Sequence, residues 1–485
     1  MIHLNRFFNH LILLLITILP GGCAAVGPDY ISPDVPAPVS WHTGPAGGIN
    51  AENTDARMLA HWWTTLNDPI LSGLIGEAVA ENLSLKEARA RVREARARRG
   101  ISRASLFPAL DISGSAGKSR SSENSGSGSE SELYSTGFDA GWELDIFGGV
   151  RRAVEAADAD LQASRADLQD VRVSIAAEVA LNYVEMRTYQ TRLTVAEANL
   201  SAQKETYELT RSRYEAGLSD ELAVQQARYN MESTRSQLPT LRTGLEEALN
   251  RLAVLLGEQP GTVHDRLKMR RAIPVAPAEV AVGVPAETLR RRPDVRQAER
   301  SLAAQTARIG EAVADLYPKF RLSGSIGLES LSSGSLLSGD SHTYSFGPAI
   351  SWPIFDAGAI RNNIAVQSAL QEQALIQYQS AVLNALEEVE NALVAYAEEQ
   401  LRRTSLQKAT RAAKKAADLA GNKYMAGLID FSEVLDAQRS LLSFQDDLAQ
   451  SDGAITANLI TLYKALGGGW TSLAGAQNNI TTTGN

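Results

Sequence analysis

Hydrophobic and polar positions along the chain change their spacing twice within each of two long segments. Residues 72–105 and 286–316 are rich in Ala, Arg and Glu and predict helices, which Pro108 and Pro318 bring to an end. Apolar and polar residues then alternate, and a helical spacing returns further along. Each segment therefore predicts a helix, a β-hairpin and a second helical region.

The alternating residues predict two hairpins, within residues 109–147 and 319–354. Apolar residues such as Phe138 and Ile146 occupy one face in the first hairpin, and Asp139, Glu143 and Asp145 occupy the other. Polar loops at about 119–132 and 329–342 separate the strands. Strands of about nine to eleven residues match the roughly 9–11 residues of a tilted membrane-spanning strand.

The helical regions that follow run from about Gly149 to Tyr214 and from about Ala359 to Tyr424. In the first, apolar residues recur every seven positions at 179, 186, 193, 200 and 207, which predicts coiled-coil-like packing. At about 1.5 Å per residue, each helix would be roughly 100 Å long. Gly217 and Gly427 are expected as helix caps, and return helices are predicted at about 220–256 and 430–466.

The two segments are copies of one unit, displaced by 210 residues. Tyr214 to Asp220 recurs as Tyr424 to Asp430, and Pro108, Trp142 and Leu256 recur in the same register. The expected organisation is a signal peptide (1–22), an N-terminal tether (23–60), a first repeat (61–257), a connector (258–283), a second repeat (284–467) and a polar tail (468–485).

The amino terminus predicts a bacterial lipoprotein signal. Arg6 precedes a nine-residue run from Leu11 to Leu19, which is too short to span a bilayer, and Cys23 follows two glycines. Cys23 would carry acyl chains, and Ala24 after it fits sorting to the outer membrane. Pro20 departs from the usual lipoprotein pattern, so a secreted chain with a free thiol stays open as an alternative.

Four strands cannot close a barrel, and an open sheet edge is costly in lipid, so several chains must contribute. Three chains would supply twelve strands. Trp142 and Trp352, each near a strand end, are candidates for a belt of aromatic residues at the membrane surface. Asp139, Glu143 and Asp145 are candidates for a watery lumen. A soluble element with one solvated face is the alternative.

Composition narrows the classes of function. With 47 basic against 56 acidic residues, the net charge of −9 disfavours general nucleic-acid binding, and a single cysteine excludes disulfide scaffolds and cysteine-based zinc sites. The sequence has no histidine pair at metal-ligand spacing, no phosphate loop and no nucleophile elbow. We therefore expect no enzyme activity, cofactor or metal.

Several motifs in a fixed order resemble the TolC superfamily of outer-membrane efflux channels, in its lipoprotein branch of NodT and OprM type. The motifs are Cys23 to Tyr30, Trp62-Trp63 with Asp68-Pro69, Trp142 to Gly148, Arg292 to Arg296, Ser351 to Gly358, Glu387 to Leu393, Val434 to Leu441 and Ala465 to Trp470. The resemblance implies a mainly helical homotrimer, with a twelve-stranded β-barrel continued by a long periplasmic α-helical barrel. It would connect a periplasmic adaptor and an inner-membrane pump, commonly of the resistance-nodulation-division class, to the exterior.

The resemblance also assigns candidate functional residues. Asp436 matches an acidic residue that lines the closed periplasmic aperture, and Glu433 matches a second such position in some members; ordinary solvated helix charges are the alternative. Candidates for contact with the adaptor are Tyr214, Gly217, Leu218, Tyr424, Gly427 and Leu428. Helix capping and turn packing are the alternative, and both roles can hold.

Two other functions stay open at this point, a periplasmic coiled-coil adaptor lipoprotein and an unrecognised hydrolase. The sequence does not name the exported compound.

Overall fold

The computed structural model describes residues 25–34, 37–44, 47–50, 56–275 and 280–470. These residues fold as two units. The first comprises residues up to Asp34, Arg91–Arg165 and Gln297–Gln379; the second comprises Val35–Ala90, Ala166–Arg296 and the chain from Ser380. The predicted signal peptide, Cys23 and most of the predicted C-terminal tail lie outside the described residues.

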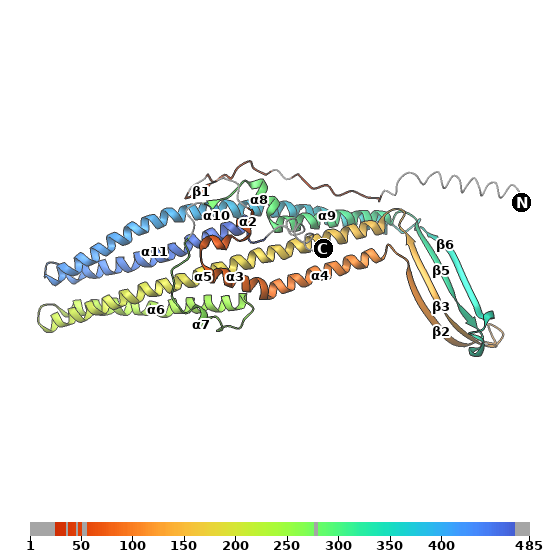
Figure 1. Ribbon diagram of the computed structural model, residues 1–485, viewed down its shortest axis with the longest axis horizontal. Coiled ribbons are helices and arrows are strands. Elements are labelled where there is room, and N and C mark those ends of the chain that lie inside the picture. The colour runs from red at the N-terminus through yellow and green to blue at the C-terminus, as the bar shows by residue number, and fades with distance from the viewer. Residues whose placement is uncertain (1–24, 35–36, 45–46, 51–55, 276–279, 471–485) are drawn as a thin grey trace, which may run out of the picture. The chain divides into compact units, whose positions relative to one another are not determined.

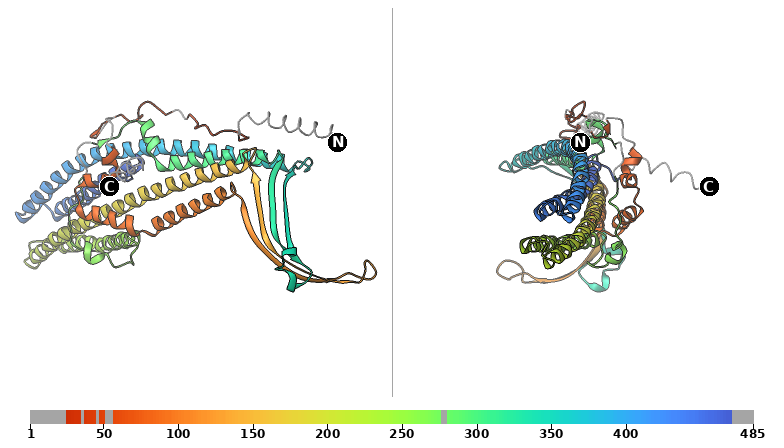
Figure 2. Two further views of the ribbon diagram at one scale, coloured as in Figure 1. Left: turned by 45° about the vertical axis from the view of Figure 1, so that its right-hand side comes forward. Right: turned by 90° about the vertical axis from the view of Figure 1, so that its left-hand side faces the viewer.

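The first unit contains an antiparallel sheet in the order β2-β3-β5-β6. Each repeat supplies one hairpin, and pairing of β3 with β5 joins the hairpins. The sheet is one curved layer (Figure 1 and Figure 2). Its strands are β2 (Ala109–Arg120), β3 (Glu130–Leu144), β5 (Lys319–Ser330) and β6 (His342–Ser351), and two short 3₁₀ turns, Ser333–Ser335 and Gly339–Ser341, lie between the last two strands.

The hairpins are confirmed, but three strands are longer than predicted. The strands have 12, 15, 12 and 10 residues. The Ser- and Gly-rich sequence around residue 119 looked like the start of a loop, yet Ser119 and Arg120 pair with Ser131 and Glu130. Backbone pairing continues there because small and polar side chains are tolerated on an exposed strand.

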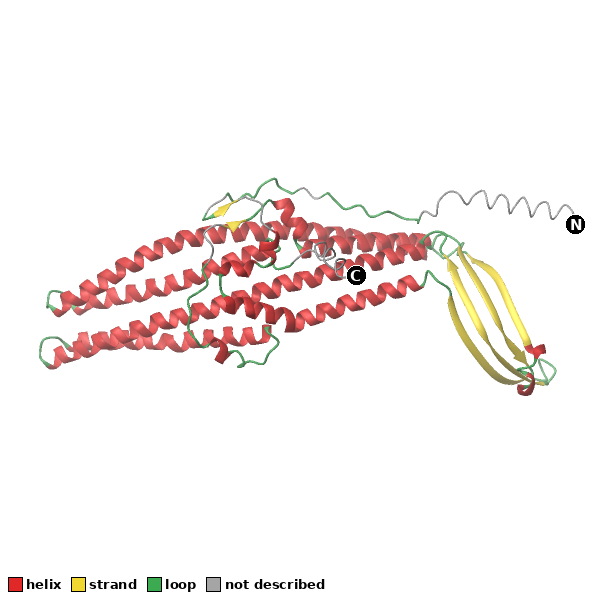
Figure 3. Ribbon diagram, in the orientation of Figure 1, coloured by secondary structure: helices red, strands yellow, loops and turns green. Residues whose placement is uncertain are grey.

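Two long helices follow the hairpins, α5 (Gly149–Glu215) and α10 (Ala359–Met425), each of 67 residues. Return helices α6 (Glu221–Leu255) and α11 (Phe431–Ala465) have 35 residues each. Figure 3 shows α5 beside α6 and α10 beside α11. The heptad prediction for α5 is confirmed at Val179, Met186 and Leu193, which are buried.

The two helices predicted before the hairpins are each divided by a break. The first consists of α3 (Pro69–Glu81) and α4 (Leu83–Ala104), and the second of α8 (Pro285–Arg291) and α9 (Pro293–Ala314). Asn82 causes the first break, because its side chain accepts a bond from the Leu85 amide at 3.2 Å as a helix N-cap does. Pro293 causes the second break, since its ring suits the first residue of a helix.

The second unit has an apolar core that we call the hub. There, Trp62 of the 3₁₀ turn Trp62–Leu66 stacks on Tyr463 of α11 with ring centroids 5.6 Å apart, and Ile175 to Met186 of α5 pack around them. The remaining short elements of this unit are α2 (Ala56–Ala60), α7 (His264–Leu267) and the parallel strands β1 (Ile49–Asn50) and β4 (Val280–Ala281).

Candidate channel wall and gate

The strand register sorts side chains onto two faces of the sheet, because directly opposed residues point to the same side. One face is apolar: Ile112 opposes Phe138, Phe138 opposes Ile326, and Ile326 opposes Tyr344. All four side chains are exposed. An exposed apolar face across four strands is what contact with lipid requires.

The opposite face carries small and polar residues. Ser113, Gly137, Gly327 and Thr343 follow one another across the four strands. The glycines permit close approach here, since a Cβ at Gly137 would lie 2.9 Å from the Ile326 carbonyl oxygen. This face therefore presents hydroxyl groups and backbone to its surroundings.

Two of the three predicted lumen carboxylates lie on this polar face. Asp139 accepts a hydrogen bond from the Ser113 hydroxyl at 2.8 Å and lies opposite Asp111 in the register. Glu143 is exposed and lies opposite Arg321. The polar face thus carries both negative and positive charge.

Asp145 has a different place from the one predicted. β3 ends at Leu144, so Asp145 lies beyond the strand. Its carboxylate accepts bonds from the amides of Val150 and Arg151, at 3.1 and 2.9 Å, and from the Arg151 guanidinium at 3.1 Å. Asp145 therefore caps the start of α5, where a carboxylate meets unpaired amides and the positive end of the helix dipole.

Trp142 and Trp352 make equivalent contacts in the two repeats. Each indole Nε1 donates to a backbone carbonyl just after the preceding helix, Trp142 to Leu106 and Trp352 to Leu316, both at 3.0 Å. Trp142 lies near the end of β3, and Trp352 directly follows β6. Both indoles thus have a polar contact at the edge of the apolar face, the arrangement typical of an interfacial tryptophan.

The turns between the long and return helices have nearly identical geometry. Gly217 and Gly427 both have φ of 71°. The Leu218 amide donates to Arg213 at 2.8 Å, and the Leu428 amide donates to Lys423 at 2.9 Å. These bonds define a glycine C-cap and confirm the predicted helix caps. The side chains of Tyr214, Leu218 and Leu428 at these turns are exposed.

Tyr424 differs from the other turn residues. It is only 7 % exposed and packs edge-on against Phe431, with ring centroids 5.4 Å apart. The Arg213 guanidinium lies 5.0 Å from its ring centroid. Tyr424 therefore packs the turn, which is the alternative role expected from the sequence, and its contact with the adaptor stays a prediction.

Glu433 and Asp436 are exposed on one side of α11. Their neighbours Val434 and Leu435 are buried in a small apolar cluster near the turns and fix the orientation of this helix. In the described chain, neither carboxylate has a hydrogen bond or ion pair. Gln226 occupies the position in the first repeat that corresponds to Asp436.

A row of polar contacts between α5 and the α10–α11 pair escaped the sequence prediction. Arg192 binds Asp446 at 2.7 and 3.0 Å, and Thr206 accepts from Gln438 at 2.9 Å. Asn199 donates to Gln445 at 2.6 Å, and Arg213 donates to the Met425 carbonyl at 3.1 Å. We call Arg192, Asn199, Thr206 and Arg213 the polar seam. Their seven-residue spacing is visible in the sequence, one position before the apolar heptad line.

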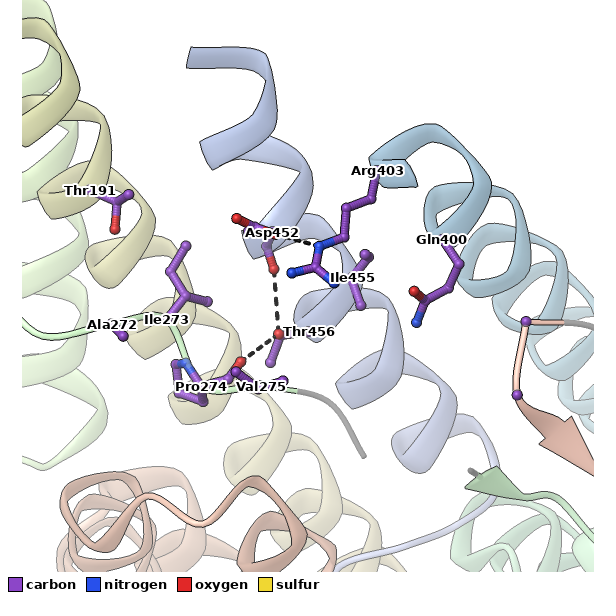
Figure 4. A pocket seen from close by; sticks show the side chains of 12 residues that line it. Thr191, Ala272, Ile273, Pro274, Val275, Gln400, Arg403, Asp452, Ile455 and Thr456 are labelled. Atoms are coloured by element: carbon purple, nitrogen blue, oxygen red, sulfur yellow. Dashed lines mark hydrogen bonds and ion pairs between the residues drawn. The ribbon is translucent and has the colours of Figure 1, made fainter. Parts of the chain in front are cut away.

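A cleft of about 530 Å³ lies between α5, α10, α11 and two connecting segments, Gly47–Gly48 and Ala272–Val275 (Figure 4). Its polar groups largely bind one another. Arg403 donates to Asp452 at 2.6 Å, and the Thr456 hydroxyl donates to the Pro274 carbonyl at 2.7 Å. These bonds join α10, α11 and the connecting segment Ala272–Val275 across the cleft.

The structure also bears on metal sites and membrane helices. Among the described residues, no group of three or more His, Cys, Asp or Glu side chains is arranged to hold a metal ion. Nor does that part of the chain contain a helix long and apolar enough to cross a membrane.

Comparison with known proteins identifies the class. The family model "Outer membrane efflux protein" matches residues 74–258 and again 284–468, so the second match begins 210 residues after the first. The chain belongs to this family of outer-membrane efflux channels. The duplication and the expected fold class, a mainly helical protomer of TolC-like type with β-hairpins, are confirmed.

Particular relatives extend over almost the whole chain. Nodulation protein T of Rhizobium leguminosarum bv. trifolii is 34 % identical, covering 95 % of this chain and 97 % of the relative. The cation efflux system protein CusC of Escherichia coli is 31 % identical, covering 93 % and 96 %. The solved outer-membrane channel OprN is 37 % identical with a TM-score of 0.87, covering 92 % of this chain and all of that one. The resemblance predicted from the sequence is confirmed: this is an outer-membrane efflux channel.

Proposed function

We propose that three copies of this chain form a passive conduit across the outer membrane. It would receive small toxic compounds or drugs from a periplasmic adaptor and an inner-membrane pump, of the resistance-nodulation-division type. Relatives named for toluene and for cations indicate that cargo varies within the family.

The sheet is the observation that carries this proposal. β2 and β6 are its edges, each hydrogen-bonded on one side only, and its apolar face is exposed. In lipid each unpaired backbone group costs several kcal/mol, so the edges must pair with strands of other copies. Three copies give twelve strands, a number within the range of known outer-membrane barrels.

Cell fractionation tests the assembly. We expect the protein in outer-membrane fractions, as a species of three chains that dissociates on heating in detergent. Release by carbonate washing as a monomer would contradict the proposal and favour a peripheral coiled-coil adaptor, which has no need of an exposed apolar sheet.

We further propose that Asp436 and Glu433 form carboxylate rings at the periplasmic aperture. Rings of like charge attract cations and repel themselves, so removing one should ease opening. Asp436→Ala should therefore raise single-channel conductance in planar bilayers at least severalfold. Gln226→Ala is the matched control at the corresponding uncharged position, and equal conductance in the two variants would remove Asp436 from the gate.

The segment after Cys23 supports a lipid anchor at this cysteine. The Val26 amide donates to Phe147 at 3.0 Å, and Arg152 donates to the Val26 carbonyl at 3.1 Å and to Asp29 at 2.7 Å. Cys23 is two residues before Ala25, a reach of about 7 Å. Acyl chains on Cys23 would thus start near the end of β3, beside the proposed lipid-facing surface.

Mass spectrometry of the mature N-terminus tests the anchor. We expect an acylated Cys23, and we expect Cys23→Ser to lose the acyl mass while the chain still assembles in the membrane. An unmodified thiol in the wild-type chain would rule out the anchor.

Trp142 and Trp352 would form the membrane belt nearer the helices, and Asp139 and Glu143 would line the lumen. For the adaptor contact we propose the exposed turn residues Tyr214, Leu218 and Leu428, with Gly217 and Gly427 shaping the turns. Leu218→Asp and Leu428→Asp should abolish adaptor cross-linking, whereas Val254→Asp, exposed on α6 away from the turns, should preserve it. Loss of cross-linking in all three variants would contradict a specific contact at the turns.

A further inference from the structure

The strand register of the two hairpins follows the displacement of 210 residues between the repeats. Ala109 of β2 lies opposite Gly141 of β3, and adding 210 to both numbers gives Lys319 and Ser351, which lie opposite each other in β5 and β6. The pairing of β3 with β5 joins the two hairpins. Its counterpart would join β6 to β2, but within the described chain these strands are the two edges of the sheet. The equivalent joint therefore requires a second copy.

A pair of glycines marks the joint between β3 and β5. Gly137 lies opposite Gly327, and a Cβ added to them would lie 2.9 and 2.5 Å, respectively, from a backbone carbonyl oxygen of the opposite strand. The corresponding positions at the two edges are also glycines, Gly347 of β6 and Gly117 of β2. A Cβ at either of these would meet nothing within 4 Å. The single chain thus supplies no steric reason for glycine at the two edge positions.

The end of β6 is a second sign of a missing neighbour. The last three residues of β3, Trp142–Leu144, pair with β5 and lie beyond the pairing with β2. Their counterparts, residues 352–354, follow the end of β6, where Trp352 and Ile354 are 57 % and 86 % exposed. Because a strand is held by bonds to its neighbours, these three residues have no ladder to join in a single chain.

We propose that β6 of one copy pairs with β2 of the next in the register of the β3–β5 joint, with Gly347 opposite Gly117. This inference rests on the proposed barrel of three chains and adds the residues that meet in it. The same register sets Ala349 opposite Ser115, and residues 352–354 extend β6 along the next copy.

The side chains at this joint suit the two faces of the sheet. Trp352 would lie opposite Ile112 on the apolar face, as Trp142 lies opposite Leu322. Pro348 has no amide hydrogen, so the joint has at most one backbone bond fewer than the β3–β5 joint, and proline is tolerated on such an edge strand. A slip of one residue would turn the apolar side chains of one strand to the polar face. On that face the opposed residues are small: Ser119 and Ser345, Gly117 and Gly347, Ser115 and Ala349, and Ser113 and Ser351.

Disulfide cross-linking of the full-length protein, recovered from outer membranes as the heat-sensitive species of three chains, tests the register. Ser115→Cys combined with Ala349→Cys should give, after oxidation, chains that separate only on reduction. Directly opposed Cα atoms are about 4.5–5.5 Å apart, which a disulfide can bridge. Two pairs displaced by two residues should give about tenfold less product, because residues so displaced are about 7–8 Å apart. These pairs are Ser113→Cys with Ala349→Cys, and Ser115→Cys with Ser351→Cys.

An intrachain pair is the positive control for oxidation. Asp139 and Ser325 are the counterparts of Ala349 and Ser115 and lie opposite each other within one chain, so Asp139→Cys with Ser325→Cys should form a disulfide. Reaction of this control without cross-linking at the proposed pair would overturn the register, and so would efficient cross-linking of a displaced pair. In both cases the species of three chains would still stand. Absence of that species from outer membranes would contradict the barrel as well.

Alanine variants of the glycines give a second measurement. Gly347→Ala should lower the temperature at which the three chains separate in detergent, because its Cβ would meet the backbone of the next copy as a Cβ at Gly137 meets β5. Gly339→Ala is the matched control: a Cβ there also meets nothing within 4 Å, and Gly339 lies in a 3₁₀ turn outside the sheet. Equal separation temperatures for the two variants would disprove the close contact at Gly347.

Discussion

The contact between α5 and α11 has two halves of opposite character. From Ile455 to Ala465, α11 is packed into the hub, and Leu459, Ile460 and Leu462 are fully buried against α5 and the 3₁₀ turn. From Gln438 to Asp446, it meets α5 through the polar seam. Gly453 lies between the halves, where a Cβ would overlap the Thr188 hydroxyl oxygen.

The two halves contribute differently to the free energy of unfolding and to the position of the α10–α11 pair. Apolar burial is non-directional and contributes about 25 cal/mol per Å² of buried surface. Opening the hub would therefore remove a large stabilising free energy. A hydrogen bond exchanges protein for water partners, and its net contribution is only about 0.5–1.5 kcal/mol. We therefore expect the hub to stabilise the fold, and the seam to set the position of the α10–α11 pair at low cost.

The hub should give the largest effect. Leu459→Ala removes a fully buried side chain, and large-to-small changes of this kind cost about 2–5 kcal/mol. Thermal unfolding should show a clear fall in melting temperature. Val254→Ala, which shortens an exposed residue of α6, should leave it nearly unchanged. Equal shifts in the two variants would mean that the hub does not dominate stability.

Gly453 should give an intermediate effect. Gly453→Ala must push Thr188 aside or separate the helices, and overpacking of this kind costs about 1–3 kcal/mol. Gly421 of α10 is the matched control, because a Cβ there meets nothing within 4 Å. Gly421→Ala should stabilise the protein slightly through helix propensity. If Gly453→Ala were also stabilising in thermal unfolding, the close approach at this crossing would be disproved.

The long helices were predictable from the sequence because the patterns that indicate them recur, along each helix or in both repeats. The helix ends at Gly217 and Gly427 carry a cap residue in both repeats, and the heptad line of α5 continues over five positions. The break at Asn82 was missed because one Asn in a long helical pattern does not by itself mark a helix end, although Asn is a preferred N-cap. Its second bond, to the Leu255 carbonyl 173 residues away, is visible only in the fold. The end of β3 was missed because Ile146 continues the alternation past the point where Asp145 starts to cap α5.

Candidate functional residues were predictable only where a single residue is itself informative. Asp436 and the exposed turn residues Leu218 and Leu428 were predicted from motif and position, and their roles stay predictions. The seam was missed because its meaning depends on pairing: Arg192 is one of many charged helix residues until Asp446, 254 residues away, lies beside it. Its seven-residue spacing is a usable signal, since polar residues in such a row lie along one side of the helix.

The seam should give the smallest effect on stability. The Arg192 and Asp446 side chains are 22 % and 29 % exposed, so solvent weakens their bidentate pair. A double-mutant cycle of Arg192→Ala and Asp446→Ala should give a coupling energy of about 1 kcal/mol or less, which decreases at high salt. Arg211 and Glu215, an exposed pair on α5, provide the control cycle and should give a smaller value. A coupling energy as large as the cost of Leu459→Ala would show that the seam stabilises the fold as much as the hub does. It would contradict the division of the α5–α11 contact at Gly453 into a strongly and a weakly stabilising half.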